Sequence, residues 1–105
     1  MSFPLNTRWT LKDWQGHLAE MYGKVNAKRR PLETFARVTE MGTGVSRSVR
    51  EQSHELQRKF FPRFLSWLMG LCTQLEIDLE SATYASYPGI CPYCRSDADC
   101  TCKLR

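Results

Sequence analysis

Apolar side chains recur every three or four residues along the stretch from Glu55 to Glu80, which is the repeat of one helical face. The members of that face are Phe60, Phe64, Leu68, Leu71, Cys72 and Leu75. Phe61, Leu65 and Trp67 widen it, and Ser53 is placed to cap the helix. A helix buried on more than one side needs at least two packing partners. We therefore expect a helical bundle built around this stretch.

An amphipathic pattern also precedes this central stretch near the N-terminus. Thr10 can cap a first helix, with Asp13 in the position that completes a capping box. The apolar face that follows consists of Leu11, Trp14, Leu18, Met21, Tyr22 and Val25. Gly23 is the expected stop of this helix, because glycine is common just after a helix end.

Between the first helix and the central stretch, Pro31 suits the first turn of another helix, whose apolar side continues to Val49. Gly42 and Gly44 lie inside it, and each glycine costs about 1 kcal/mol relative to alanine in a helix interior. Two glycines so close together need either a close neighbour or a break in the helix. We expect a kink or local loosening near Met41 to Gly44.

Two further signals complete the helical pattern. Pro62 removes a backbone hydrogen bond from the central helix, so we expect a kink or a fresh helix start there. Asp78 can cap a short fourth helix from Leu79 to Tyr84. The expected fold is all-α, a bundle of three main helices and a short fourth over residues 1–88. A cysteine-rich tail forms residues 89–105.

Composition and charge restrict the class of protein. The 105 residues are 42% hydrophobic and 25% charged, which is ordinary for one globular domain. No run approaches the roughly 20 apolar residues of a membrane span, and the start MSFPLNTRW lacks the layout of a secretory signal, so we expect a cytoplasmic protein. A net charge of +4 suits anionic ligands such as nucleotides but not a dedicated nucleic-acid binder. Solvated surface cations explain the charge equally simply.

The tail carries the strongest chemical pattern in the sequence. Cys91 and Cys94 have the spacing of a zinc knuckle, and Cys100 and Cys102 supply a second pair. We expect a closed four-sulfur zinc site, which is structural because no position is left for water. Disulfides are the alternative, disfavoured by the missing secretion signal and by the crowding of the cysteines. The fifth cysteine, Cys72, fits the apolar helix face as a small core residue.

The order of these elements resembles that of the MazG-like, all-α nucleoside triphosphate pyrophosphohydrolases. The matching pieces cover most of residues 10–102 and are Phe35-Ala-Arg-Val-Thr-Glu40, Trp67-Leu68, Ile77-Asp-Leu-Glu80, and Tyr87-Pro88 leading into Cys91-Pro-Tyr-Cys94. Some members end in a similar cysteine-rich tail. The resemblance implies a MazG-like fold, cleavage between the α- and β-phosphates of a nucleotide, and magnesium held by acidic residues on two helices. It also implies assembly, and we expect a homodimer.

Most of the implied magnesium ligands are absent. The family pattern is Glu-Glu-x-x-Glu on one helix and Glu-x-x-Asp on the next. Glu40 matches the first acid, but Met41 and Gly44 stand where the second and third belong. Phe60 and Arg63 take the places of the second pair. Because an arginine repels cations, we expect no bound magnesium and little or no pyrophosphohydrolase activity.

These replacements exchange negative charge for positive charge, which suggests ligand binding without hydrolysis. Arg63, Lys59 and, on the facing helix, Arg47 place cations where the family has carboxylates. Arginine binds phosphate bidentately without a metal ion. Trp14 could stack a base, although its spacing also fits core packing. We expect a non-catalytic module that binds a nucleotide or another phosphorylated ligand, or a protein, with Glu40 as the remaining family acid.

Three other interpretations stay open at the level of sequence. The cations are solvated, and Phe60 and Met41 fill the former pocket. Alternatively, the chain is an active enzyme in which Glu40, Glu51 and Glu55 regroup around one magnesium ion. In the third, the zinc tail is an adaptor for a protein or a nucleic acid.

Overall fold

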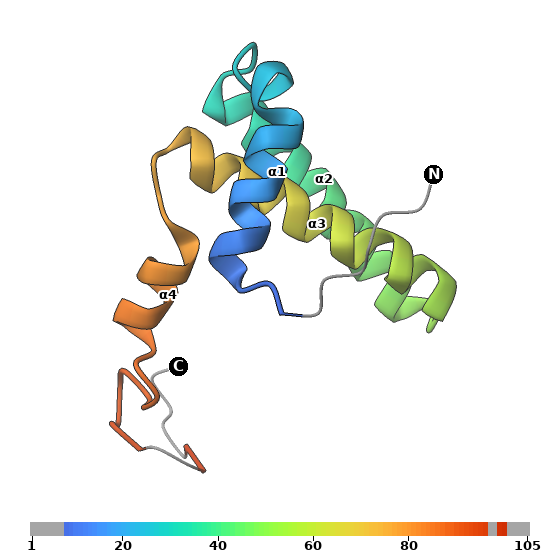
Figure 1. The fold of residues 1–105 in the computed structure, drawn as a ribbon. Coiled ribbons are helices and arrows are strands. Elements are labelled where there is room, and N and C mark those ends of the chain that lie inside the picture. The colour runs from blue at the N-terminus through green and yellow to red at the C-terminus, as the bar shows by residue number, and fades with distance from the viewer. Residues whose placement is uncertain (1–7, 97–98, 101–105) are drawn as a thin grey trace.

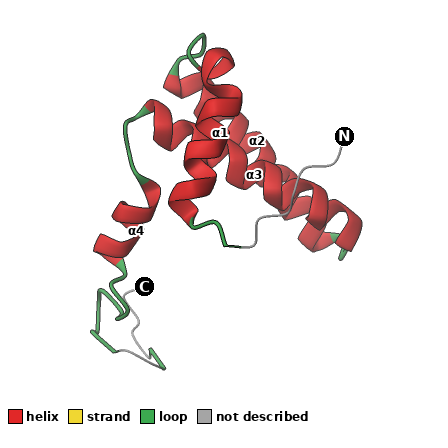
Figure 2. Ribbon diagram, viewed as in Figure 1, coloured by secondary structure: helices red, strands yellow, loops and turns green. Residues whose placement is uncertain are grey.

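The structure, a computed structural model, describes residues 8–96 and 99–100. These residues form four helices and no strand: α1 (Leu11–Asn26), α2 (Pro31–Arg50), α3 (His54–Gln74) and α4 (Leu79–Ser86). In Figure 1, α2 and α3 lie side by side as an antiparallel hairpin, α1 crosses α3, and α4 leads away toward the tail. Figure 2 shows loops before α1, between the helices and in the tail. The all-α class and the four predicted helices are confirmed.

The helix starts follow the caps in the sequence. Thr10 Oγ1 accepts the Asp13 N–H at 3.2 Å, and the Thr10 N–H donates to the Asp13 carboxylate at 2.9 Å, which completes the capping box. Ser53 caps α3, and Asp78 caps α4, each by accepting a backbone N–H three residues ahead. Pro31 occupies the first turn of α2, as predicted.

Two helix ends differ from the prediction. α1 continues past Gly23 to Asn26, because the Gly23 carbonyl still accepts a hydrogen bond from the Ala27 N–H at 2.9 Å. The predicted stop at Gly23 is therefore wrong. α4 extends two residues beyond Tyr84 to Ser86. Cap chemistry is local and shows where a helix begins, whereas nothing local forces these helices to end early.

α2 runs without interruption through both of its glycines, so the local loosening predicted near Met41 to Gly44 is wrong. Each glycine instead has a close neighbour on α3. A Cβ atom added at Gly44 would lie 2.3 Å from the Phe60 ring, and one added at Gly42 would lie 3.4 Å from the Phe64 ring. The glycines are the flat surface against which the two aromatic rings pack, and they let α2 and α3 approach closely.

α3 also continues through Pro62, so a fresh helix start at that position is wrong. Proline lacks the N–H that would bond to the Arg58 carbonyl. The helix nevertheless packs against both α2 and α1 (Figure 1), and these contacts hold its two halves in one element. Tertiary packing outweighs the loss of one backbone hydrogen bond.

The hydrophobic core is small. Among the described residues, the buried hydrophobic side chains are Val38, Met69 and Cys72. The prediction of Cys72 as a core residue is confirmed, and burial raises the pKa of its thiol. Fifteen large hydrophobic side chains are at least 38% exposed, so one copy leaves much apolar surface uncovered. No helix in the described part of the chain is both long and apolar enough to cross a membrane.

Gln15 connects α1 to the segment between α3 and α4. Its Nε2 donates to Thr73 Oγ1 at 3.2 Å and to the Ile77 carbonyl at 2.8 Å, while its Oε1 accepts the Leu79 N–H at 3.0 Å. The side chain is buried, and both ends of its amide have partners. These three hydrogen bonds fix the base of α4 against α1.

The close approach of α2 and α3 predicts a clear effect of alanine at Gly44. Gly44→Ala would place a methyl carbon 2.3 Å from a carbon atom of the Phe60 ring, which is closer than van der Waals contact. Overpacking of this kind costs roughly 1–3 kcal/mol. The matched control, Gly23→Ala, adds a methyl group in open space within α1 and should stabilise the protein by about 0.5–1 kcal/mol. Urea unfolding followed by circular dichroism measures both. A Gly44→Ala midpoint at or above that of the wild type would contradict the packing described.

Candidate functional site

Three cysteines of the tail converge on one point. The Sγ atoms of Cys91, Cys94 and Cys100 all lie within 4.8 Å of one another, and that of Cys100 is 3.5 Å from each of the other two. A disulfide bond is about 2.05 Å long, so these distances are not disulfides. Sulfurs that share a tetrahedral zinc ion, each at about 2.3 Å, lie about 3.8 Å apart. The three thiols are therefore spaced to hold a metal ion.

The backbone around Cys91 and Cys94 turns tightly. The Arg95 N–H donates to the Cys91 carbonyl and the Cys91 N–H donates to the Ser96 carbonyl, both at 2.8 Å. Arg95 adopts the left-handed region with φ of 63°, which bends the chain back on itself. Hydrogen bonds from the Ser96 side chain and backbone, and then from the neighbouring thiols, lower the pKa of Cys94 to about 6. A thiolate is thus available at neutral pH.

Cys102, the predicted fourth ligand, lies outside the described residues. The three described cysteines belong to a segment with almost no packing of its own, since no described side chain from Tyr87 to Cys100 is buried. Apolar contacts therefore do not explain why the three sulfurs meet. A bound cation is an ordinary reason for such an arrangement.

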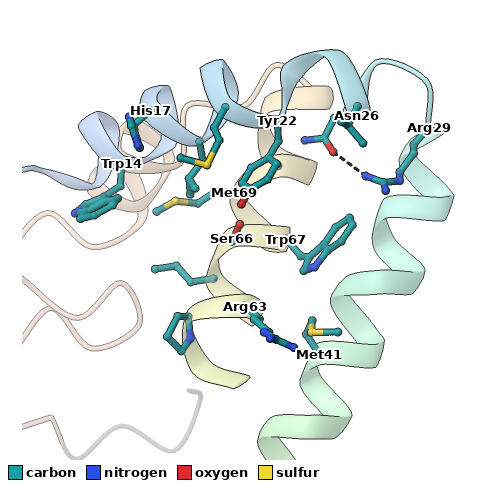
Figure 3. Close-up of a pocket in the computed structure, with 16 residues that line it drawn as sticks. Trp14, His17, Tyr22, Asn26, Arg29, Met41, Arg63, Ser66, Trp67 and Met69 are labelled. Carbon is teal, nitrogen blue, oxygen red and sulfur yellow. Dashed lines mark hydrogen bonds between the residues drawn. The ribbon is translucent and has the colours of Figure 1, made fainter. Parts of the chain in front are cut away.

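A second feature is an open groove of about 900 Å³ between α1 and α3, which also reaches Met41 of α2 (Figure 3). Its lining is mostly apolar and aromatic. The apolar wall consists of Trp14, Leu18, Met21, Tyr22 and Val25 from α1 and of Pro62, Leu65, Trp67 and Met69 from α3. This is the size and character of a pocket for a small organic ligand.

The charges that line the groove are cationic. Arg29 and Arg63 both line it, and no acidic side chain does. The Arg29 guanidinium lies over the Trp67 ring, 4.9 Å from the centroid, and its Nη1 donates to Asn26 Oδ1 at 3.1 Å. In Figure 3, Trp67 lies between Arg29 and Arg63, so the two guanidinium groups lie on opposite sides of this aromatic side chain.

Another part of the groove is aromatic. The rings of Trp9 and Trp14 meet edge to face with centroids 4.6 Å apart, and the Trp9 and His17 centroids are 4.8 Å apart. Trp14 is 40% exposed, so it belongs to the groove wall and not to a closed core. Figure 3 places Trp14 and His17 together, away from the two arginines.

The structure brings together only part of the predicted ligand site. Arg63 and Trp14 line the groove, whereas Glu40, Arg47 and Lys59 do not. Met41, directly after Glu40, faces the groove in place of the acid that the family pattern would put there.

The three predicted residues outside the groove have partners of their own. Glu40 Oε2 accepts a hydrogen bond from Arg37 Nη1 at 2.8 Å, and Arg47 Nε donates to Glu51. Both are exposed pairs, the first within α2 and the second between α2 and its C-cap residue, of the kind that contributes little to stability. Lys59 lies over the aromatic ring of the next residue, 5.4 Å from its centroid.

Arg29 is a groove residue that sequence reasoning missed. It belongs to a run of three cations at positions 28–30 between α1 and α2, and nothing in the sequence distinguishes it from its neighbours. Its partner Trp67 lies 38 positions further along the chain. Only the crossing of α1 over α3 brings the two together.

Comparisons with models of known protein families, with curated proteins and with solved structures found no match to this chain. The MazG-like resemblance therefore stays a prediction made from the sequence. Two features of the structure itself bear on function, the cysteine cluster and the groove.

The cysteine geometry predicts thiolate coordination that can be seen directly. Titration with Co²⁺ should produce the near-ultraviolet absorption of a thiolate-to-metal charge transfer. Cys94→Ser should remove most of this absorption, because Cys94 Sγ is one of the three converging sulfurs. Cys72→Ala is the matched control and should keep it, since Cys72 is buried on α3 and does not belong to the cluster. An unchanged spectrum in Cys94→Ser would contradict the site.

Proposed function

We propose that this protein is a non-catalytic binding module with a MazG-like helical fold, whose groove takes a nucleotide or another phosphorylated ligand. The observation that carries the proposal is the charge of the lining, which includes two arginines and no carboxylate. Guanidinium groups bind phosphate oxygens directly, without a bridging metal. The resemblance places magnesium ligands at the positions of Met41 and Arg63, and both of these side chains line the groove.

The arrangement of acidic residues favours binding over hydrolysis. Glu40 and Glu51 are paired with Arg37 and Arg47, and Glu55 lies in the first turn of α3. Within the described residues, the cysteine cluster is the only set of three His, Cys, Asp or Glu side chains close enough to share an ion. Magnesium in a phosphoryl-transfer site needs clustered carboxylate oxygens. An active magnesium-dependent pyrophosphohydrolase is therefore the less favoured function.

For the tail, we infer that the metal is zinc and that its role is structural. Thiolate ligands at this spacing select zinc among the common divalent ions of proteins. Cys102 would supply the fourth sulfur and close the coordination sphere. Because the described part of the tail buries no side chain, the ion would supply the cross-link that a core does not.

For the oligomeric state, we propose a homodimer formed through the hairpin face, an uncharged surface along α2 and α3. On α2 its residues alternate spacings of four and three: Phe35, Thr39, Gly42, Ser46 and Val49. On α3 they are spaced by three, four and seven: Phe61, Phe64, Leu68 and Leu75. Spacings of three and four are typical of the contact surface between packed helices. None of these nine residues lines the groove.

Three details support burial of the hairpin face by a second copy. Phe35, Val49 and Phe61 are each at least half exposed in one copy, which is costly for large apolar side chains. Thr39 Oγ1 already donates to the Phe35 carbonyl at 3.2 Å, so its hydroxyl can be buried without losing a partner. A symmetric pairing of two such hairpins would bury all of these residues in one four-helix arrangement.

The dimer is tested by placing a charge on the hairpin face. Phe61→Asp should convert a dimer into a monomer, because two carboxylates would be buried at the interface. Tyr84→Asp is the matched control, since Tyr84 is an aromatic residue on α4 that is 71% exposed and lies outside the face. Light scattering at increasing protein concentration gives the mass, and a wild-type monomer at high concentration would refute the dimer.

Ligand binding without hydrolysis is tested by calorimetry with several nucleotides, each with and without magnesium. We expect heat that does not depend on magnesium, no release of pyrophosphate, and about tenfold weaker binding in Arg63→Gln through the loss of a charge-assisted hydrogen bond. Arg58→Gln is the control, because Arg58 is an exposed arginine of the same helix outside the groove. No heat and no thermal shift with any nucleotide would refute binding, and magnesium-dependent pyrophosphate release would refute the loss of catalysis.

A further inference from the structure

We infer that the groove is built for an amphiphilic anion, a molecule with an apolar or aromatic body and one acidic group, and not for a polyphosphate. The inference rests on the proposed function in taking the groove as the binding site, and it names the class of ligand. It depends on the composition of the lining, on the number of available cations and on their position within the groove.

The apolar part of the lining indicates that most of the ligand is apolar. Nine of the sixteen lining residues are the apolar and aromatic side chains of the wall described above, and Met41 adds a tenth. Tyr22 and Val25, both 44–50% exposed, would lose contact with water when a ligand fills the space. Burial of such surface favours a hydrophobic ligand and gives nothing to a hydrated phosphate chain.

The cations set the number of acidic groups. Arg63 is exposed and has no hydrogen-bond or ion-pair partner among the described residues, so its guanidinium is available. Arg29 is held by Asn26 and Trp67, which fixes its orientation beside the groove. The available guanidinium of Arg63 can pair bidentately with one carboxylate, sulfonate or phosphate group. A triphosphate carries several charges in a row, and the rest of the lining offers them no lysine or arginine.

The position of these groups sets the orientation of the ligand. Arg63 lies beside Met41, while Trp14 and His17 lie together on α1, away from Arg63 (Figure 3). The acidic group would lie at Arg63, with the apolar body extending toward Trp14 of α1. The separation of a cationic site from an apolar wall matches a ligand that has one acidic group and an apolar body. It does not match a ligand that is charged along its whole length.

Two fluorescent probes of nearly equal shape separate the effect of charge from that of apolar contact. The anionic probe is 8-anilinonaphthalene-1-sulfonate, and the neutral one is N-phenyl-1-naphthylamine. In the wild-type protein, we expect the sulfonate to bind about tenfold more tightly than the neutral probe, the effect of one charge-assisted contact. Arg63→Gln should abolish this preference and leave binding of the neutral probe unchanged, whereas Arg58→Gln should change neither.

A second variant establishes that the probes occupy the groove, because such dyes also bind other exposed apolar surfaces. Val25→Asp places a carboxylate on the groove wall at a half-exposed position of α1 that tolerates a polar side chain. It should weaken both probes by at least about tenfold, through the lost apolar contact and the added polar group. Circular dichroism checks that the variant remains helical.

The outcomes separate this inference from the proposed function. Equal affinity for both probes in the wild-type protein, no effect of Arg63→Gln, or no effect of Val25→Asp would overturn the amphiphilic-anion inference. If adenosine triphosphate displaces the sulfonate and binds more tightly in an Arg63-dependent way, the inference fails while the proposed phosphate-binding function stands. If neither the sulfonate nor any nucleotide responds to Arg63→Gln, both fail.

Discussion

The contact between the Phe60 ring and Gly44 sets the distance between α2 and α3, and the rest of the molecule is attached to that hairpin. A side chain of any size at Gly44 would push the ring away, and α2 and α3 would separate. The groove depends on this spacing, because Met41 of α2 reaches it only when α2 lies close to α3. The hairpin face depends on the same spacing, because the Phe64 ring of α3 lies against Gly42 of α2. This contact makes the exposed residues of the two helices one continuous surface.

A chain with so few buried hydrophobic side chains must gain stability elsewhere. Domains of about 100 residues are only marginally stable even when they bury a normal core. In this protein, the proposed metal at the cysteine cluster, the Gln15 hydrogen bonds and the proposed dimer through the hairpin face would each compensate for part of the missing core. The first two would act within one copy, the metal by a cross-link and Gln15 by three part-buried hydrogen bonds. The third requires a second copy, which is why the proposed dimer and the small core belong to one explanation.

Local chemistry was predictable from the sequence, and contacts between distant residues were not. The caps at Thr10, Ser53 and Asp78 depend on neighbours three residues away, and the structure confirms all three. The two glycines of α2 showed that something unusual happens there, but only the position of Phe60 shows that it is packing and not a break.

The same distinction applies to the candidate sites. The spacing of Cys91 and Cys94 is local, so it pointed directly to a shared ion. The ligand site was predicted in part: Arg63 and Trp14 line the groove, but Arg47 pairs along its own helix with Glu51. The stacking of Arg29 on Trp67 follows from the crossing of α1 over α3, which no periodicity in the sequence specifies.

The amide of Gln15 links two parts of the molecule that look independent. α1 forms one wall of the groove, and the same helix is fastened through Gln15 to the carbonyl of Ile77 and the N–H of Leu79, which flank the cap of α4. Any outward swing of α1 that widens the groove must either break these hydrogen bonds, at about 1 kcal/mol each, or carry α4 and the cysteine tail along with it. The positions of α4 and of α1 are therefore coupled through the Gln15 side chain.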